Sequence, residues 1–205
     1  MTMEQGGGRA GEYMTPKSKT PKILKFVVTY LEMTAPPTLS VIMPSNVKLA
    51  LLRAEQPTVS FYRYLYNTVG EPWLWWERRQ MSDEKLRKIL DTEGIELYVL
   101  YVNGVPAGFA ELDRRKPPDV DLVYFGLIPD FIGRGLGRYF LNAIIKLAWS
   151  YKPRRLTVNT CNFDHPMALR AYQRAGFNPI DQSHIDVDDP RDRGIIPADI
   201  SHAND

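Results

Sequence analysis

A run of glycines and arginines at residues 133–138, GRGLGR, separates an expected strand from an expected helix. The first backbone N–H groups of a helix have no partner within the helix and lie at the positive end of its dipole. Glycine lets the backbone approach a ligand closely, and Arg134 and Arg138 add positive charge. Such a turn is typical of a site that binds a diphosphate group.

The spacing argues against two common classes of phosphate-binding turn. The glycines follow G-x-G-x-G, which differs from the G-x-G-x-x-G pattern of dinucleotide sites. No acidic residue ends the next expected strand, at 156–160, and the turn lacks the Lys-Ser/Thr ending of a P-loop. NAD and ATP are therefore poor candidates. A flexible loop that precedes a helix is the structural alternative.

The same turn resembles the diagnostic segment of the GNAT superfamily of acyl-CoA N-acyltransferases. That segment reads Q/R-x-x-G-x-G/A and lies after a strand and before a helix. Here it is IGRGLG at residues 132–137. Gly135 and Gly137 match the two required glycines, whereas Ile132 stands where the family has Gln or Arg.

A second segment, at residues 165–177, resembles the family pattern N-x-x-A-x-x-x-Y-x-x-x-G-F. His165 stands where Asn is usual. The hairpin at 101–109 is similar to the second and third strands of the family. The resemblance covers residues 95–178, with the motifs in the family's order and spacing. The residues that match the second pattern are Ala168, Tyr172, Gly176 and Phe177.

The resemblance implies acetyl-CoA as co-substrate, bound where the fourth strand of the sheet separates from the fifth. The pantetheine arm would pair with exposed backbone groups of the fourth strand, where Gly126 would allow close approach. A backbone N–H near Leu127 would stabilise the oxyanion that forms on the thioester carbonyl. His165 would replace the family Asn in a cofactor contact, or cap the turn. The expected cofactor-binding residues are Phe125, Gly126, Leu127, Ile128, Gly133, Arg134, Gly135, Leu136, Gly137, Arg138 and His165.

The reaction implied by the resemblance needs a proton acceptor for the amine and a proton donor for the leaving thiolate. Tyr172 matches the family tyrosine that serves as general acid; its structural alternative is a core tyrosine. Asp121 is the first candidate base, because strand alternation would place it on one face with Val123 and Phe125 and some family members have Glu there. Glu111 on the neighbouring strand is a second candidate, and a chain of water molecules is a third.

Aromatic residues upstream of the matched region are candidates for an acceptor pocket. Trp73, Trp75, Trp76 and Tyr62 could bind a cationic amine through cation–π contacts, and core packing is the alternative. The charged run at 77–79 is expected on a solvated helix face. Cys161 is expected to pack in the interior and not to act as a nucleophile, because direct transfer needs no acyl-enzyme.

Apolar periodicity and turn residues place these side chains on strands and helices. The strands are expected over 22–32, 96–102, 105–112, 120–128, 156–160 and 180–187, and the helices over 57–69, after Ser82, after Gly137 and over 166–175. Asn103-Gly104 predicts a tight hairpin. The fold class is α+β, with a mixed, mostly antiparallel sheet flanked by helices. The resemblance adds a splay between the fourth and fifth strands.

Length and composition set the outer limits of the interpretation. The chain has 205 residues, 44% of them hydrophobic and 24% charged, with a net charge of +2. This fits one globular domain and gives no reason to expect a nucleic-acid partner. The first apolar stretch is too short to span a membrane. One cysteine excludes an intrachain disulfide and favours a reducing, cytoplasmic location.

The sequence thus predicts one acetyltransferase domain at 22–188, with its cofactor-binding core at 95–178. Residues 1–21 are expected to form a flexible tail, and 189–205 an acidic, solvated tail. The predicted activity is direct transfer of an acetyl group from acetyl-CoA to a primary amine of a small molecule or peptide, without a metal, by a monomer or homodimer. The alternatives are a non-catalytic acyl-CoA-binding regulator of the same fold, and a nucleotide-binding module of another fold.

Overall fold

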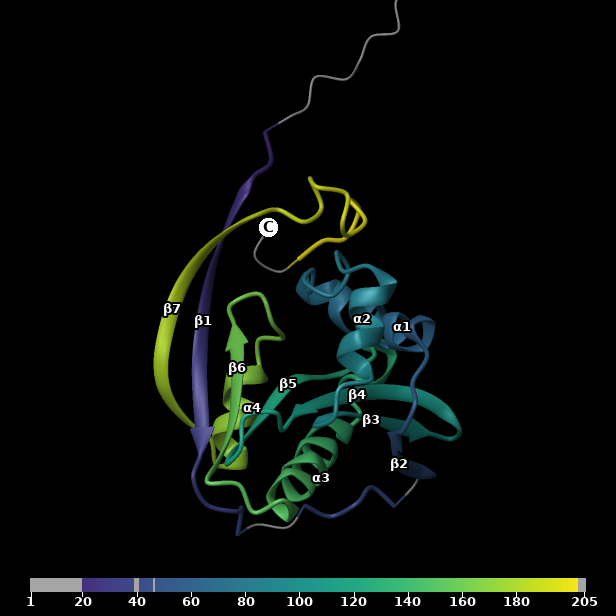
Figure 1. Ribbon diagram of the computed structural model, residues 1–205, viewed down its shortest axis with the longest axis vertical. Coiled ribbons are helices and arrows are strands. Elements are labelled where there is room, and N and C mark those ends of the chain that lie inside the picture. Colours follow the sequence, from purple (N-terminus) through teal and green to yellow (C-terminus); the bar gives the residue numbers. More distant parts are fainter. Residues whose placement is uncertain (1–19, 39–40, 46, 203–205) are drawn as a thin grey trace, which may run out of the picture.

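A computed structural model describes residues 20–38, 41–45 and 47–202, and it shows a seven-stranded sheet flanked by helices (Figure 1). The strand order is β2-β3-β4-β5-β6-β1-β7. Every neighbouring pair is antiparallel except β5 and β6, which run parallel. The predicted fold class, a mixed and mostly antiparallel sheet, is confirmed.

The expected elements form close to their predicted bounds, with one addition. The strands are β1 (Ile23–Met33), β2 (Leu49–Ala54), β3 (Ile95–Val102), β4 (Val105–Asp113), β5 (Asp119–Leu127), β6 (Arg155–Cys161) and β7 (Asn178–Asp188). The helices are α1 (Val59–Gly70), α2 (Asp83–Leu90), α3 (Leu136–Ser150) and α4 (Ala168–Ala175), with short 3-10 turns at Glu71–Trp73 and Pro129–Phe131. Strand β2 is the element that the sequence analysis does not predict.

Local sequence signals explain where the helices begin and end. The Thr58 hydroxyl accepts from the N–H of Phe61 at the start of α1, and the Ser82 hydroxyl accepts from the N–H of Lys85 at the start of α2. Gly176 ends α4 in a left-handed conformation, with φ of 110°. The β3–β4 hairpin turns at Asn103 and Gly104, both with positive φ, as the Asn-Gly pair predicts.

The first strand of the chain lies in the far half of the sheet, between β6 and β7 (Figure 1). Strand β2, which follows it in the sequence, pairs with β3 at the opposite edge. The chain therefore changes from one edge of the sheet to the other between Met33 and Leu49, and Figure 1 shows the described parts of this segment along the lower side. The N–H of Val41 donates to the Asn142 side chain of α3 during the crossing, at 3.4 Å.

Pairing between β5 and β6 is interrupted partway along the strands. The ladder runs from Asp119 opposite Arg155 to Leu122 opposite Val158 and goes no further. The five remaining residues of β5, Val123 to Leu127, have no partner in β6, whereas β4 pairs with the last four of them on the other side. The predicted splay between the fourth and fifth expected strands lies at this point.

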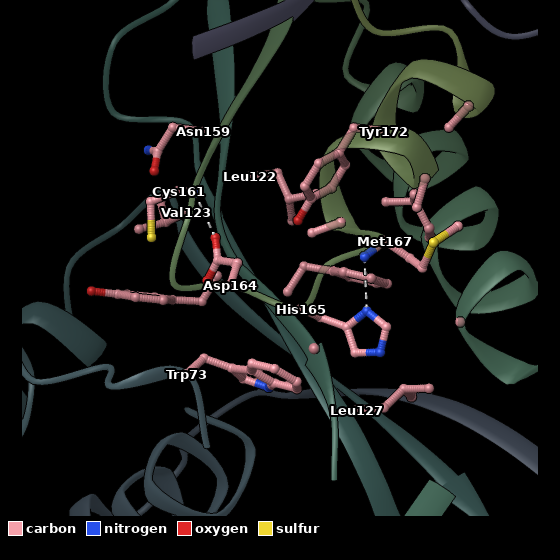
Figure 2. Close-up of a pocket in the computed structure, with 18 of the residues that line it drawn as sticks. Trp73, Leu122, Val123, Leu127, Asn159, Cys161, Asp164, His165, Met167 and Tyr172 are labelled. Carbon is pink, nitrogen blue, oxygen red and sulfur yellow. Dashed lines mark hydrogen bonds between the residues drawn. The ribbon is translucent and has the colours of Figure 1, made fainter. Parts of the chain in front are cut away.

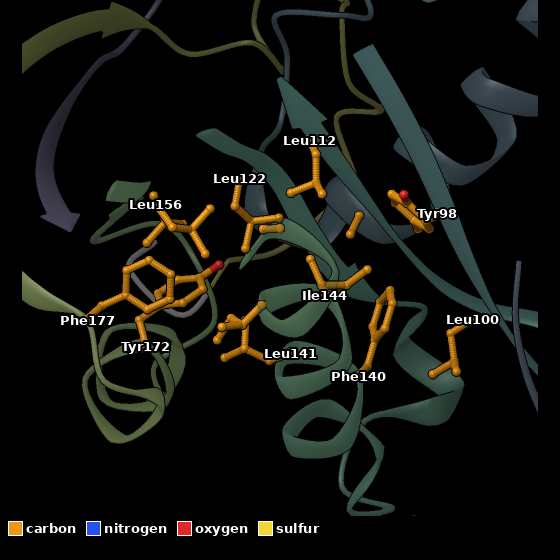
Figure 3. Close-up of a cluster of buried hydrophobic side chains, with 14 of the residues drawn as sticks. Tyr98, Leu100, Leu112, Leu122, Phe140, Leu141, Ile144, Leu156, Tyr172 and Phe177 are labelled. Atoms are coloured by element: carbon orange, nitrogen blue, oxygen red, sulfur yellow. The ribbon is translucent and has the colours of Figure 1, made fainter. Parts of the chain in front are cut away.

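Helices cover both faces of the sheet and create two apolar clusters. Helices α3 and α4 pack with Leu112, Leu122 and Leu156 on one face (Figure 3). Helices α1 and α2 pack on the other face with Val99 and Phe109. No helix of the described residues is long and apolar enough to cross a membrane.

The C-terminal segment differs from the solvated tail that its acidic composition indicates. Asp189 and Ile196 are buried, and Asp189 forms an ion pair with Arg191 at 2.8 Å. His202 is also buried, and its Nε2 lies 2.8 Å from the carbonyl oxygen of Phe163. Local arginine partners and apolar side chains allow the acidic segment to pack. Residues 203–205, and residues 1–19 of the expected N-terminal tail, lie outside the described residues.

Gly126 of β5 has no side chain because helix α1 occupies the space. A Cβ built there would lie 2.4 Å from Cγ1 of Val69, far inside van der Waals contact. We expect Gly126→Ala to destabilise the fold by about 1–3 kcal/mol through overpacking, measured by urea unfolding. Val69→Ala should relieve the clash. It should therefore lower the unfolding free energy less in the Gly126→Ala background than in the unmodified protein. Additive costs for the two changes would contradict this explanation.

Candidate active site

A cleft of about 1190 Å³ opens where β5 and β6 separate (Figure 2). Its walls come from the unpaired half of β5, from the turn before α3, from α4 and from the segment between α1 and α2. The segment that follows β1, including Ala35 to Thr38, closes part of the rim. The interruption of the ladder therefore places backbone groups, helix ends and aromatic side chains around one space.

The glycine-rich turn has the geometry that the sequence predicts. Gly133 and Gly135 have φ values of 79° and 76°, and Gly135 is the N-cap of α3. Side chains rarely adopt this left-handed conformation, so both positions favour glycine. Gly137 and Arg138 line the cleft beside them, so this part of the cleft has a positive charge. Arg174 of α4, which the sequence analysis does not identify, also lines the cleft.

Three expected cofactor-binding residues lie away from the cleft. The Arg134 guanidinium lies over the Phe131 ring, 5.2 Å from its centroid, and Arg134 and Leu136 line a separate small hollow. The side chain of Ile128 is buried, and its backbone N–H donates to the carbonyl oxygen of Ala107 at 2.9 Å. Phe125, Gly126 and Leu127 do line the cleft, with backbone free of a β6 partner.

Tyr172 lies inside the cleft, on α4. Its ring is buried and packs edge-on against Phe125 and Phe177, and Figure 2 shows its hydroxyl directed into the space beside Leu122. Burial, reinforced by the negative charge of Asp164, raises the pKa of Tyr172 well above its ordinary value. The hydroxyl therefore holds its proton at neutral pH and can donate it.

Asp121 lies outside the cleft because a bulge changes the alternation of β5. The β4–β5 register shifts between Glu111 and Leu112, which leaves Val123 as the extra residue. Leu122 and Phe125 consequently pack in the same cluster with α3, although they are three residues apart. Asp121 therefore does not share a face with Phe125, and it accepts a 2.8 Å hydrogen bond from the Thr157 hydroxyl. The expectation from strict alternation is wrong here.

Glu111 and Tyr62 are joined in the interior instead of facing the cleft. The Glu111 carboxylate is fully buried and accepts hydrogen bonds from the Tyr62 hydroxyl at 2.6 Å and from Arg78 at 2.7 Å. Burial raises the pKa of Glu111, although Arg78 and Tyr62 oppose this shift. The arrangement fixes the segment after α1 to the sheet, and it leaves neither predicted residue on the cleft surface.

An aromatic wall forms one end of the cleft, beside the segment after α1. Trp73, Trp75 and Trp76 line it as expected, and Tyr66 and Tyr124 complete it. The ring centroids of Tyr66, Trp75 and Tyr124 lie 5.1–5.6 Å from one another. Trp75 and Trp76 also pack against the apolar clusters, so core packing accounts for part of this wall, and a role in binding an acceptor stays a prediction.

Two carboxylates that the sequence analysis does not identify accompany the aromatic wall. Glu77 lines the cleft and accepts a 3.0 Å hydrogen bond from the Tyr124 hydroxyl. Asp164 lines it from the turn after β6 and accepts from the Trp75 indole N–H at 3.1 Å and the Thr160 hydroxyl at 2.7 Å. Residues 77–79 are not a solvated helix face: they follow an irregular turn, and Arg78 is largely buried.

The position of Glu77 next to three tryptophans in the sequence is the signal that could have identified it. Asp164 has a similar signal, because it directly precedes His165.

His165 lines the cleft and packs edge-on against Trp73, with the ring centroids 5.1 Å apart. Its Nδ1 lies 3.1 Å from the backbone N–H of Met167 and accepts from it (Figure 2). With Nδ1 as an acceptor, Nε2 carries a proton and can donate it.

Cys161 has the surroundings of an inert thiol. Burial, followed by the negative charge of Asp164, raises its pKa to about 12. A thiol reacts as the thiolate, and this cysteine stays protonated at neutral pH. The geometry agrees with the expectation that it is not a nucleophile.

The sequence profile of the acetyltransferase (GNAT) family matches residues 62–177, more than half of the chain. The chain therefore belongs to the GNAT acetyltransferase family. The matched region contains the unpaired half of β5, the glycine-rich turn, Tyr172 and the aromatic wall. No curated protein sequence is significantly similar to the chain.

Solved structures of the same fold share little sequence with the chain. A GCN5-related N-acetyltransferase from Sphaerobacter thermophilus is 15% identical, with a TM-score of 0.59, and the match covers 78% of this chain and 50% of that one. The aminoglycoside N-acetyltransferase AAC(6')-Iy, solved with CoA, is 17% identical, with a TM-score of 0.51 and coverage of 69% and 95%. The ribosomal-protein-S18-alanine N-acetyltransferase from Escherichia coli is 18% identical, with a TM-score of 0.53 and coverage of 65% and 80%.

The buried Arg78–Glu111 pair gives a stability prediction with a defined pH dependence. Arg78→Met leaves Glu111 buried without its cation, and we expect a loss of about 3–5 kcal/mol in unfolding free energy at pH 7. Removing Arg78 raises the Glu111 pKa further in the folded state. When a carboxyl group has a higher pKa in the folded state than in the unfolded state, the protein loses stability as pH rises from the lower pKa to the higher one. The destabilisation caused by Arg78→Met should therefore be larger at pH 8 than at pH 5.

Arg79→Met is the matched control for this prediction. The Arg79 side chain is as buried as that of Arg78, at 10% and 11% exposure, but its partner Glu71 reaches solvent with 32% exposure. Its loss should therefore be smaller and nearly independent of pH over this range. Urea unfolding at both pH values measures the difference. Equal losses in the two variants would show that the buried carboxylate is not the cause.

Proposed function

We propose that the protein transfers an acetyl group from acetyl-CoA directly to a primary amine, with both substrates bound in one cleft. The observation that supports this most is that charges of opposite sign line different parts of the cleft. Arg138 lines it beside the glycine-rich turn, and Glu77 and Asp164 line it beside the aromatic residues, which donate hydrogen bonds to them. An anionic nucleotide and a cationic amine would enter such a cleft in one relative orientation.

The cofactor would use backbone groups for most of its contacts. The diphosphate would bind the N-terminus of α3 at Gly135 to Gly137, with Arg138 beside it. The pantetheine arm would take the position that β6 leaves open along Phe125 to Leu127. A backbone N–H near Leu127 would then face the thioester carbonyl and stabilise its oxyanion. His165, as a donor from Nε2, would contact the cofactor in place of the family Asn.

The proton transfers are assigned to side chains that line the cleft. The amine gives up one proton towards the carboxylates of Glu77 and Asp164, through water, and its lone pair attacks the thioester carbon. The nitrogen of the tetrahedral intermediate gives up a second proton by the same route, the carbon–sulfur bond breaks, and the sulfur takes the proton of the Tyr172 hydroxyl. Solvent reprotonates Tyr172, and the acetamide and CoA leave.

A second candidate function is acyl-CoA binding without catalysis. Ile132 lines the cleft where the family has Gln or Arg, and His165 lines it where Asn is usual. A regulator of this kind would bind CoA in calorimetric titration but release none from acetyl-CoA with any amine. Tight binding of ATP or NAD in place of CoA would instead indicate the nucleotide-binding class.

Tyr172→Phe tests the mechanism with little change in shape. We expect kcat for CoA release to fall about 10²–10⁴-fold, the range that a general acid contributes. The dissociation constant of CoA should change little, because only the hydroxyl is removed. Thiol-trapping assays and calorimetry measure the two quantities.

Tyr64→Phe is the matched control, since Tyr64 is an exposed tyrosine of α1 that does not line the cleft. Its turnover should equal that of the unmodified protein. Turnover of Tyr172→Phe within a factor of two of the unmodified protein would remove Tyr172 as the acid, and would leave acetyl transfer itself intact.

A further inference from the structure

We propose that the acceptor is a primary ammonium group on an aromatic or other apolar body, and that polyhydroxylated and polycationic amines are poor substrates. The proposal rests on the proposed acetyl transfer and specifies its second substrate. It follows from the composition of the aromatic end of the cleft, which combines a large apolar surface with two carboxylates.

The apolar surface at this end comes from two opposite parts of the chain. Trp73 and Trp76 contribute from the segment after α1. Phe26 of β1 and Ile185 of β7, which are register partners, contribute from the outer half of the sheet. Ile185 is 45% exposed, so this wall still has apolar area that a ligand could cover. A bound aromatic or branched aliphatic group would remove that area from water on both sides.

The carboxylates supply the charge that an ammonium group needs. Glu77 is an exposed residue with one oxygen, Oε2, engaged by Tyr124. Asp164 lies deeper, where its charge acts on both Tyr172 and Cys161. Tyr124 donates to Glu77 and Trp75 donates to Asp164, and the centroids of these two rings lie 5.2 Å apart, so the two carboxylates belong to the same part of the cleft.

The same walls disfavour amines that have many polar groups. Asp164 uses both carboxylate oxygens within the protein, because Trp75 donates to Oδ1 while Thr160 and the backbone of Cys161 donate to Oδ2. A sugar-like acceptor would therefore bury hydroxyl groups against tryptophan and isoleucine without enough partners. Unpaired buried polar groups cost affinity, so the apolar monoamine is favoured.

The test compares amines of different character at saturating acetyl-CoA. We expect kcat/KM for 2-phenylethylamine to exceed that for spermidine and for kanamycin by at least about tenfold, from burial of the phenyl ring. Binding of 2-phenylethylamine is measured separately, by quenching of tryptophan fluorescence in the presence of CoA. 2-Phenylethanol, which has the ring without the amine, should bind at least about tenfold more weakly.

Two pairs of variants locate the specificity. Glu77→Gln should raise the KM for 2-phenylethylamine about tenfold while the CoA dissociation constant stays unchanged, and Glu84→Gln, an exposed change on α2, should alter neither. Ile185→Thr should lower kcat/KM for 2-phenylethylamine several-fold. Ile180→Thr changes the same residue type on the same strand, at 49% exposure and outside the cleft, and should have no effect.

The possible outcomes separate this inference from the proposed function. Acetylation of spermidine or kanamycin in preference to 2-phenylethylamine would overturn the acceptor class and leave acetyl transfer standing. An unchanged KM in Glu77→Gln would overturn it as well. Binding of 2-phenylethylamine and CoA without transfer to any amine would refute the proposed catalysis, while the recognition of an apolar ammonium would still be supported.

Discussion

The end of the β5–β6 ladder at Leu122 and Val158 is the constraint on which the rest of the site depends. Two parallel strands that share four pairs and then separate leave a row of backbone groups without a strand partner. Unpaired backbone groups in a protein interior are costly, so they must face water or a ligand. The cleft is the structural answer, and α3, α4 and the segment after α1 are arranged around it. The bulge at Val123 belongs to the same feature, because it turns Phe125 and Leu127 towards α3.

The distribution of charge along the cleft follows from which elements surround the split. Arg138 lines the cleft beside the glycine-rich turn, and the segment after α1 and the turn after β6 contribute Glu77 and Asp164 beside the aromatic residues. Tyr172 lies between, on α4, where burial and Asp164 keep its hydroxyl protonated. A single interruption in a ladder thus brings together a basic end, a protonated hydroxyl and an acidic aromatic end. In the proposed reaction, this distribution of charge would favour one relative orientation of the two substrates.

The sequence predicts correctly the features that depend on a few adjacent residues. It does not predict the features that depend on pairing between distant parts of the chain. The Ser82 cap, the Asn103-Gly104 turn and the glycine-rich turn are short patterns with direct conformational causes, and each has the predicted geometry. Strand β2 is half exposed and lacks a clean alternation, and its partner β3 begins some forty residues later. The bulge in β5 moved Asp121 off the expected face, because alternation says nothing about an inserted residue. The contacts of Glu77 and Asp164 are tertiary, and only their places beside three tryptophans and before His165 indicate them in the sequence.

The buried Arg78–Glu111 pair connects the stability of the core to the shape of the aromatic end of the cleft. Arg78 follows Glu77 directly, and its contacts with Glu111 and with the Tyr124 ring, 5.4 Å away, hold this segment against the sheet. Tyr124 in turn donates to Glu77. The Glu111 carboxylate is therefore buried and supports the segment, while the Glu77 carboxylate lines the cleft. A buried ion pair contributes little net stability compared with apolar packing, but it specifies one geometry. Here that geometry fixes the position of the Glu77 carboxylate, which would be the counter-charge of the proposed ammonium acceptor.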